Sequence, residues 1–279
     1  MSVSIEALKP SHFEKLRAFL QADVAHHVYL LGLLEEFGIV PGPGKPPFAF
    51  WARLDHDDIT SVVFVGGSGG LVVPSSSAAG YVADVARALS TKVRLLSALG
   101  ESTLVDTLVQ NLGGGVEPRL VKTQRLLSVS ADDLGPFTNP TLRLATEDDA
   151  AALVALAAGA VRETQARDPL QEDPVGFPLR VKQRIRAKRT YVLPVEKSLV
   201  FKLDIGARSS HGAELEGFFT APDQRRRGHF ILSLGQISRH LLSSLPRLHL
   251  RVNEADAGLI AAARKVGYVP GRAQKLVVM

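Results

Sequence analysis

The sequence predicts an α/β protein with a mixed, α+β type sheet, built from two similar halves. Three observations lead to this prediction. Residues 215–219 form an apolar run typical of a buried strand, and a helical pattern of apolar residues begins at Ile231. Residues 248–252 alternate between apolar and polar side chains like another strand. The polar, proline-containing stretch at residues 132–140 divides the chain, and each side of it opens with a strand and a capped helix.

The first half is predicted to begin with a strand-like segment at residues 5–10 and a helix that Ser11 caps. Further along, a helix at residues 81–89 lies between strands at residues 71–74 and 93–96. This order of strand, helix and strand is a common unit of α/β folds.

The second half repeats this plan. A strand at residues 142–145 leads into a helix that Thr146 caps, with acidic side chains up to Asp149 in its first turn. The basic run at residues 180–189 is predicted to be a further helix. Its charges form either a solvated face or a lip that attracts an anionic ligand.

Both halves place a glycine six residues after a proline, between a strand and a helix. These are Gly80 after Pro74 and Gly228 after Pro222. In the first half, serine and alanine fill the turn, whereas the second half has Arg225–Arg227. A helix N-terminus with free N–H groups and adjacent arginines is a phosphate-binding arrangement. The alternative is a basic loop that faces solvent.

Composition limits the ligand and the location. The chain has no cysteine, so disulfides, thiolate zinc sites and cysteine nucleophiles are excluded. No apolar stretch approaches the roughly 18 residues of a membrane span, so we expect a cytoplasmic protein without a membrane partner. Residues 1–135 carry 11 basic and 14 acidic side chains, and residues 136–279 carry 22 and 14. The basic second half therefore favours an anionic ligand. Nucleic acid is not expected, because the basic runs lack interleaved aromatic residues.

Two motifs of the second half resemble those of the GNAT acetyltransferase superfamily. Residues 225–230 match its loop Q/R-x-x-G-x-G/A, except that Phe230 stands where a small residue is usual. The strand at 248–252, Asn253, a small-residue helix from Asp256 and the Gly-Tyr start at Gly267 follow in the family's order. The whole chain is similar to a bacterial two-domain type with an N-terminal domain of unknown function. The resemblance implies tandem GNAT-like domains, 1–135 and 141–279, of which the first is degenerate.

The resemblance also implies the ligands. The expected co-substrate is acetyl-CoA or another acyl-CoA, with no metal, and the acceptor is a small-molecule or peptide amine. The residues expected to hold the co-substrate are Phe218, Phe219, Thr220, Arg225, Arg226, Arg227, Gly228, His229, Phe230 and Asn253.

Two carboxylates are the candidate catalytic groups. Glu214 lies eleven residues before Arg225, where several family members place a catalytic base. Glu216 would point from the same face of the strand, and two close acids raise each other's pKa. The alternative is a pair of acids bound to arginines or solvent. The usual tyrosine ten residues after Asn253 is replaced by Ala263, which favours a second function, a non-catalytic acyl-CoA-binding or regulatory protein. A third, weaker alternative is nucleic-acid binding.

Overall fold

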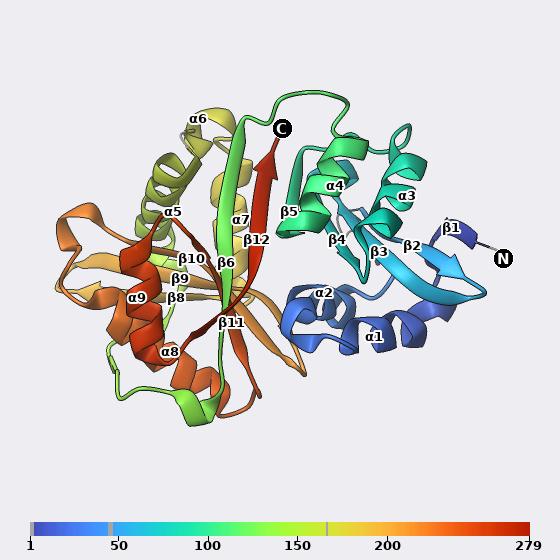
Figure 1. Ribbon diagram of the computed structural model, residues 1–279. Coiled ribbons are helices and arrows are strands. Elements are labelled where there is room, and N and C mark those ends of the chain that lie inside the picture. Colours follow the sequence, from blue (N-terminus) through green and yellow to red (C-terminus); the bar gives the residue numbers. More distant parts are fainter. Residues whose placement is uncertain (1–2, 44–46, 166) are drawn as a thin grey trace.

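One mixed sheet of twelve strands extends through the part of the chain that the computed structural model describes, residues 3–43, 47–165 and 167–279. Its strand order is β1-β2-β3-β4-β5-β12-β6-β11-β10-β9-β8-β7. Figure 1 shows the strands of the two halves side by side, with helices packed on them. The predicted α/β class with a mixed sheet is confirmed.

The N-terminal half folds into strands and helices that bury one face each. Its strands are β1 (Val3–Ala7), β2 (Phe48–Asp55), β3 (Asp58–Gly66), β4 (Leu71–Ser76), β5 (Ser97–Glu101) and β6 (Leu120–Val129). Its α-helices are α1 (Phe13–Gln21), α2 (Val24–Phe37), α3 (Ala79–Leu89) and α4 (Ser102–Leu112). In α3 the buried residues are Val82, Val85, Ala86 and Leu89, a spacing that puts them on one helical face.

The C-terminal half has the same order of elements, with the short helix α6 added between its first two longer helices. Its strands are β7 (Arg143–Leu144), β8 (Thr190–Val195), β9 (Ser198–Ser209), β10 (Gly212–Thr220), β11 (Leu248–Asn253) and β12 (Val269–Val278). Its α-helices are α5 (Ala150–Gln165), α6 (Pro169–Glu172), α7 (Gly176–Arg186), α8 (His229–Leu242) and α9 (Ala257–Val266). Helix α9 begins where the Asp256 carboxylate accepts from the Leu259 N–H at 2.9 Å, and it ends at Gly267, whose φ is +115°.

The two halves exchange their last strands. β6 pairs antiparallel with β11 of the second half, and β12 pairs antiparallel with β5 of the first half. β6 and β12 also pair with each other at the centre of the sheet. Main-chain hydrogen bonds therefore cross the predicted boundary between 1–135 and 141–279, which we keep as the proposed division of the sequence into its repeating units.

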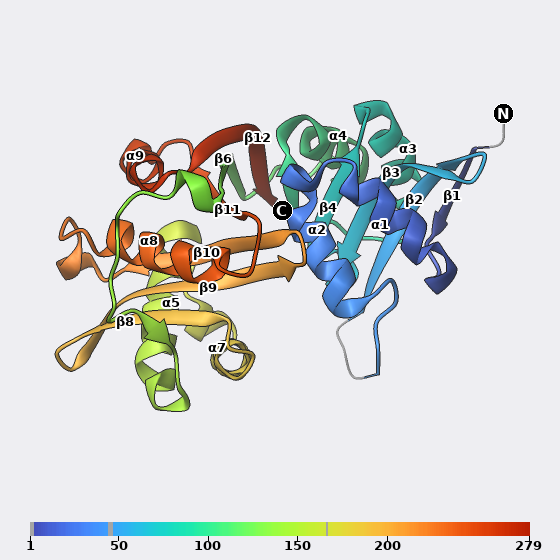
Figure 2. The same cartoon turned by 90° about the horizontal axis from the view of Figure 1, so that it is seen from below.

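In the second half of the sheet, buried polar residues gather on one face, which also carries a smaller apolar cluster under α5 and α7. Figure 2 shows α8 and α9 on one side of its strands and α5 and α7 on the other. On the α8 side, Leu215 and Leu250 are buried in the main apolar cluster together with Leu234. On the opposite face, β9, β10 and β11 carry buried polar and charged residues: Lys202, Asp204, Glu214 and His249.

Helix α2 of the first half covers part of that polar face. A Cβ atom added to Gly32 would lie 2.9 Å from the Ala207 Cβ and 2.9 Å from the Arg208 nitrogen, so helix and strand approach as closely as a glycine permits. Gln21, the last residue of α1, makes a further contact, since its side-chain nitrogen lies 2.9 Å from Nε2 of His211. The first half is thus fixed directly onto the second through side chains as well as through strands.

Two predicted elements differ from the structure. Residues 93–96 do not form a strand, and the strand β5 begins only at Ser97. Leu95 is buried although it lies in the loop before β5, and the Leu96 N–H donates to the Gly69 carbonyl at 2.9 Å. Ser11 does not cap α1 but lies within a 3₁₀ turn, Pro10–His12, that precedes the helix. The Thr146 cap of the second half is confirmed, since its N–H donates to Asp149 at 2.7 Å.

Candidate functional site

The site begins where two parallel strands separate. β10 and β11 pair at three positions, ending with Leu215 opposite Leu250. Beyond that pair β10 continues to pair with β9 and β11 continues to pair with β6, so a gap opens between β10 and β11. A register shift between Glu216 and Phe219 and a φ of +57° at Gly217 bend β10 there. In the described structure, the β10 N–H groups that point into this gap have no strand to donate to. We call this gap the splay.

The loop after β10 has the backbone of an anion cradle. Arg226 and Gly228 both have left-handed φ values, +63° and +80°, and α8 begins at His229. Left-handed residues in such a loop turn successive N–H groups toward one point, and the helix dipole adds positive potential. A Cβ atom at Gly228 would meet nothing nearer than 3.9 Å, so the backbone conformation, rather than crowding, requires glycine.

The three arginines of the loop differ in their partners. Arg225 folds back, since its Nε donates to the Thr220 carbonyl at 3.2 Å and its guanidinium pairs with Glu163 of α5. Arg226 and Arg227 are exposed and have no ion-pair partner among the described residues. Nε2 of His229 is buried without a hydrogen-bond partner in the same set. The loop therefore offers positive charge and unused hydrogen-bonding capacity among the described residues, which suits an anionic group such as a phosphate.

The aromatic residues around the splay point to opposite faces. Phe230 packs against Phe218 with ring centres 5.4 Å apart, and both lie against the apolar cluster on the α8 side. The large side chain at position 230 therefore extends the core beneath the loop. Phe219 lies on the other face, where its ring would be 3.3 Å from a Cβ at Gly159 of α5.

Asn253 lies across the splay from these residues, at the end of β11. Its side-chain oxygen accepts from the Ala255 N–H at 3.2 Å and so shapes the turn into α9. Ala263 is fully buried within α9. Tyr268 is also buried, with its hydroxyl 2.8 Å from the Ser238 hydroxyl, so it belongs to the core.

Glu214 is buried in an ion pair. Its carboxylate accepts from Arg251 of β11, and only 4% of its side chain is exposed. Burial raises the pKa of Glu214 to about 7, against the lowering effect of Arg251, and the nearby Glu216 adds to the increase. Its neighbour His249 stays neutral, because burial and then the charges of Arg247 and Arg251 lower its pKa to about 3. A carboxyl group that titrates near neutrality suits proton transfer.

The raised pKa of Glu214 predicts a pH dependence of stability. The folded protein binds this proton up to about pH 7, whereas the unfolded chain releases it near the ordinary glutamate pKa of 4.5. The resulting stabilisation is complete below pH 4.5 and is lost as the pH rises to about 7. We expect the free energy of unfolding of the wild type, relative to Glu214→Gln, to fall by about 1–3 kcal/mol over this interval. Urea unfolding of both proteins at several pH values measures this change. Free energies of unfolding that vary with pH in the same way in the two proteins would contradict the prediction.

Glu216 is held by a second arginine and is more accessible. Arg184 of α7 lies 2.8 Å from Glu216 and 3.2 Å from Asp204, and 36% of the Glu216 side chain is exposed. Lys202 bridges Asp204 at 2.7 Å and the Gly217 carbonyl at 2.6 Å, which fixes the bend of β10. Both acids are thus bound to arginines, as the alternative interpretation of the sequence expected.

Three further arginines of the basic run at residues 180–189 are also paired. Arg180 pairs with Asp173, Arg186 with Glu147, and Arg189 with Glu36. The run therefore joins elements of the fold to one another, and Arg184 is its member at the site.

One residue of the site, Tyr29 of α2, is not among the candidates that the sequence predicts. Its ring centre lies 5.5 Å from the guanidinium carbon of Arg251. Burial raises the pKa of Tyr29, and the charges of Glu216 and Glu214 raise it further. Tyr29 sits in an apolar helix some 185 residues away in sequence from both acids, so no pattern near Glu214 or Glu216 pointed to it.

The corresponding turn of the first half is built differently. Ser75 is buried, and its hydroxyl lies 2.7 Å from Nε2 of His27, whose Nδ1 lies 2.8 Å from the Leu20 carbonyl. The turn leads to α3 from Ala78, without a charged side chain. The first half thus lacks the charges that the loop of the second half presents.

Two kinds of feature are absent from the described residues. None of their helices has the length and apolar character needed to cross a membrane. No group of three or more acidic or histidine side chains among them is arranged to hold a metal ion.

Comparison with known proteins supports the fold. No family model and no curated protein sequence matches the chain. Among solved structures, a GCN5-related N-acetyltransferase from Sphaerobacter thermophilus is 13% identical, with 99% of this chain and 94% of that one covered and a TM-score of 0.62. A GNAT-family acetyltransferase from Colwellia psychrerythraea is 12% identical over 99% and 100%, with a TM-score of 0.60. A tandem GNAT protein of the clavulanic acid biosynthesis pathway is 11% identical over 100% and 98%, with a TM-score of 0.58. The chain therefore has the fold of GNAT acetyltransferases, in the tandem form of the last of these.

Proposed function

We propose that this protein is an acyl-CoA-dependent N-acyltransferase, which transfers an acetyl or other acyl group to a small-molecule or peptide amine in the cytoplasm. The observation that carries this proposal is the cradle of Arg226, Gly228 and His229, with its free charges, beside the splay. Bound acyl-CoA would supply an activated acyl thioester. The fold it shares with GNAT acetyltransferases supports the same class of reaction.

Different residues of the chain would have separate roles in such a reaction. The loop Arg225–Phe230 would hold the phosphates, and Asn253 would border the pantetheine arm. N–H groups of β10 near Phe218, Phe219 and Thr220, which point into the splay, would stabilise charge on the thioester oxygen. Glu214 would take the proton from the attacking amine, because its raised pKa lets it accept a proton near neutral pH.

The second candidate function is a non-catalytic acyl-CoA-binding or regulatory protein. It is favoured by the ion pair that engages Glu214 and by the buried Ala263 at the usual position of a tyrosine. Both candidates share the same binding site, so only turnover distinguishes them.

We expect one coenzyme A to bind per chain, in the C-terminal half, because the first-half turn lacks charge. Calorimetry should give a stoichiometry near one, and free thiol should be released from acetyl-CoA when an amine from a broad panel is added. Two equivalent sites would contradict the assignment to one half. Tight binding without amine-dependent thiol release would favour the non-catalytic candidate.

A further inference from the structure

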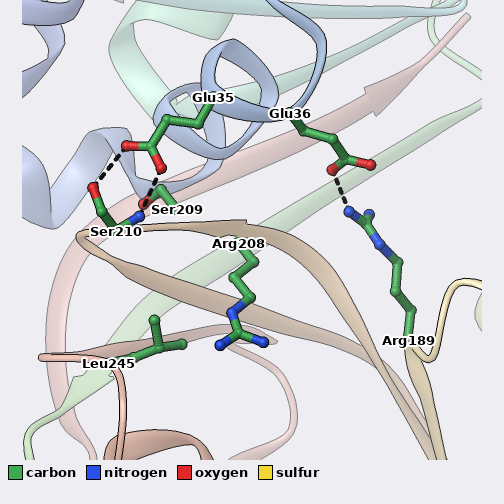
Figure 3. A pocket seen from close by; sticks show the side chains of 7 residues that line it. All are labelled: Glu35, Glu36, Arg189, Arg208, Ser209, Ser210 and Leu245. Carbon is green, nitrogen blue, oxygen red and sulfur yellow. Dashed lines mark hydrogen bonds and ion pairs between the residues drawn. The ribbon is translucent and has the colours of Figure 1, made fainter.

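Helix α2 is fixed to the C-terminal half at its C-terminal end. The Glu35 carboxylate accepts from the Ser210 N–H at 2.7 Å and from its hydroxyl at 2.9 Å. Glu36 pairs with Arg189, and Gly32 lies against Ala207 one turn earlier. Figure 3 shows Glu35 and Glu36 reaching from the helix toward Ser210 and Arg189. These residues line a hollow of about 450 Å³. A helix held this firmly can position a side chain for a neighbouring site.

Tyr29 lies on this helix, three residues before Gly32, above the start of the splay. Glu216 and Arg251 immediately follow the last paired positions of β10 and β11. The charge of Glu216 raises the pKa of Tyr29, and the guanidinium group of Arg251 lies over its ring. The positive charge of Arg184, the partner of Glu216, lowers the pKa of Tyr29. Its side chain is partly exposed, and its hydroxyl has no hydrogen-bond partner among the described residues. A free hydroxyl group thus stands at the point where the strands separate.

We propose that the Tyr29 hydroxyl, contributed by the half without a phosphate loop, donates a hydrogen bond to the coenzyme A sulfur in the reactive centre of the other half. This inference rests on the proposed function. When the amine nitrogen forms its bond to the acyl carbon, the carbon–sulfur bond breaks and its electron pair goes to sulfur. The hydrogen bond stabilises that thiolate. The amine proton passes to Glu214, and a proton from solvent completes the free thiol.

The surroundings of Tyr29 explain why a donor is needed there. Glu214 and Glu216 place negative charge near the splay, which opposes a second anion, while Arg251 and Arg184 are already paired with them. The raised pKa of Tyr29 keeps its proton in place, so it acts as a donor of a hydrogen bond rather than as an acid. Hydrogen bonds to charged acceptors are the stronger ones.

The ionisation of bound coenzyme A measures this contact without turnover. The thiolate absorbs in the ultraviolet, so its apparent pKa can be titrated on the wild type and on Tyr29→Phe, which loses only the hydroxyl. We expect the pKa of the bound thiol to be roughly one unit or more higher in Tyr29→Phe. The charged and titratable groups that face this region are the same in both proteins: Glu214, Glu216, Arg251, His249 and Arg184. Tyr81→Phe, on α3 of the same half, is the matched control and should equal the wild type.

Turnover gives a second readout. In Tyr29→Phe, kcat with acetyl-CoA should fall roughly tenfold to a hundredfold, with the KM for acetyl-CoA unchanged. An equal thiol pKa and equal kcat in the two proteins would overturn this inference and leave the proposed function standing. A wild type that does not bind coenzyme A would overturn the proposed function and this inference together.

Discussion

Glu214→Gln is expected to lower kcat by about 10²–10⁴, the usual contribution of a positioned general base. The substitution keeps the shape of the side chain and an oxygen that can accept from Arg251, but it removes the group that binds the proton. Coenzyme A affinity should stay the same, because Glu214 is paired with Arg251 on the polar face of the sheet, away from the phosphate loop. Amine-dependent thiol release and calorimetry measure the two quantities.

Glu216→Gln is the matched control, since it removes a carboxylate from the same face of the same strand. Glu216 is bound to Arg184 and is more exposed, so we expect a smaller loss of turnover than in Glu214→Gln. A large loss in Glu216→Gln beside normal turnover in Glu214→Gln would transfer the role of base to Glu216. Circular dichroism of both variants separates loss of turnover from loss of folding.

The sequence predicted the elements whose signals are local. The Gly228 boundary, the start of α8 and the start of α9 near Asp256 all depend on residues within one or two turns of the position they mark. The loop was predictable for the same reason, because its glycine, its arginines and the following helix are contiguous. The closeness of Glu214 and Glu216 followed from the two-residue period of a strand.

The exchange of β6 and β12 was not predictable from their own residues. A strand that alternates apolar and polar side chains pairs equally well with β5 or with β11, and only the assembled sheet decides between them. The start of β5 was missed because Leu95 is apolar and buried although it lies in the preceding loop. Local patterns report burial more directly than they report pairing.

The position of Tyr29 depends on how the two halves pack, which no local pattern encodes. Gly32 was the one available signal, since a glycine inside a helix reduces its stability and often marks a close approach of another element. The arginine partners of Glu214 and Glu216 were likewise hidden, because Arg251 follows on a different strand and Arg184 on a preceding helix. The sequence could place the carboxylates on one face but could not identify what lies opposite them.

Replacement of Arg226 and Arg227 by alanine is expected to weaken coenzyme A binding by about 3–6 kcal/mol, or roughly 10²–10⁴-fold in Kd, at low salt. Both guanidinium groups are exposed and unpaired among the described residues, so their charge is available to phosphate oxygens. Arg225→Ala should cost less, because that side chain is engaged by Glu163 and Thr220. The folded structure should be unaffected, since both side chains are exposed and alanine adopts the left-handed backbone of position 226 no less readily than arginine does.

The double variant Arg264→Ala with Lys265→Ala is the matched control. It removes the same charge from exposed positions of α9 in the same half, so it reports the general effect of net charge on an anionic ligand. Calorimetric titration with coenzyme A at low and high salt compares the two double variants. Contacts at the loop predict a large loss for Arg226 and Arg227 that shrinks as salt rises, and a small loss for the control. An equal affinity for coenzyme A in both double variants would show that the loop is not the phosphate site, because the two pairs of charges differ in their position on the protein.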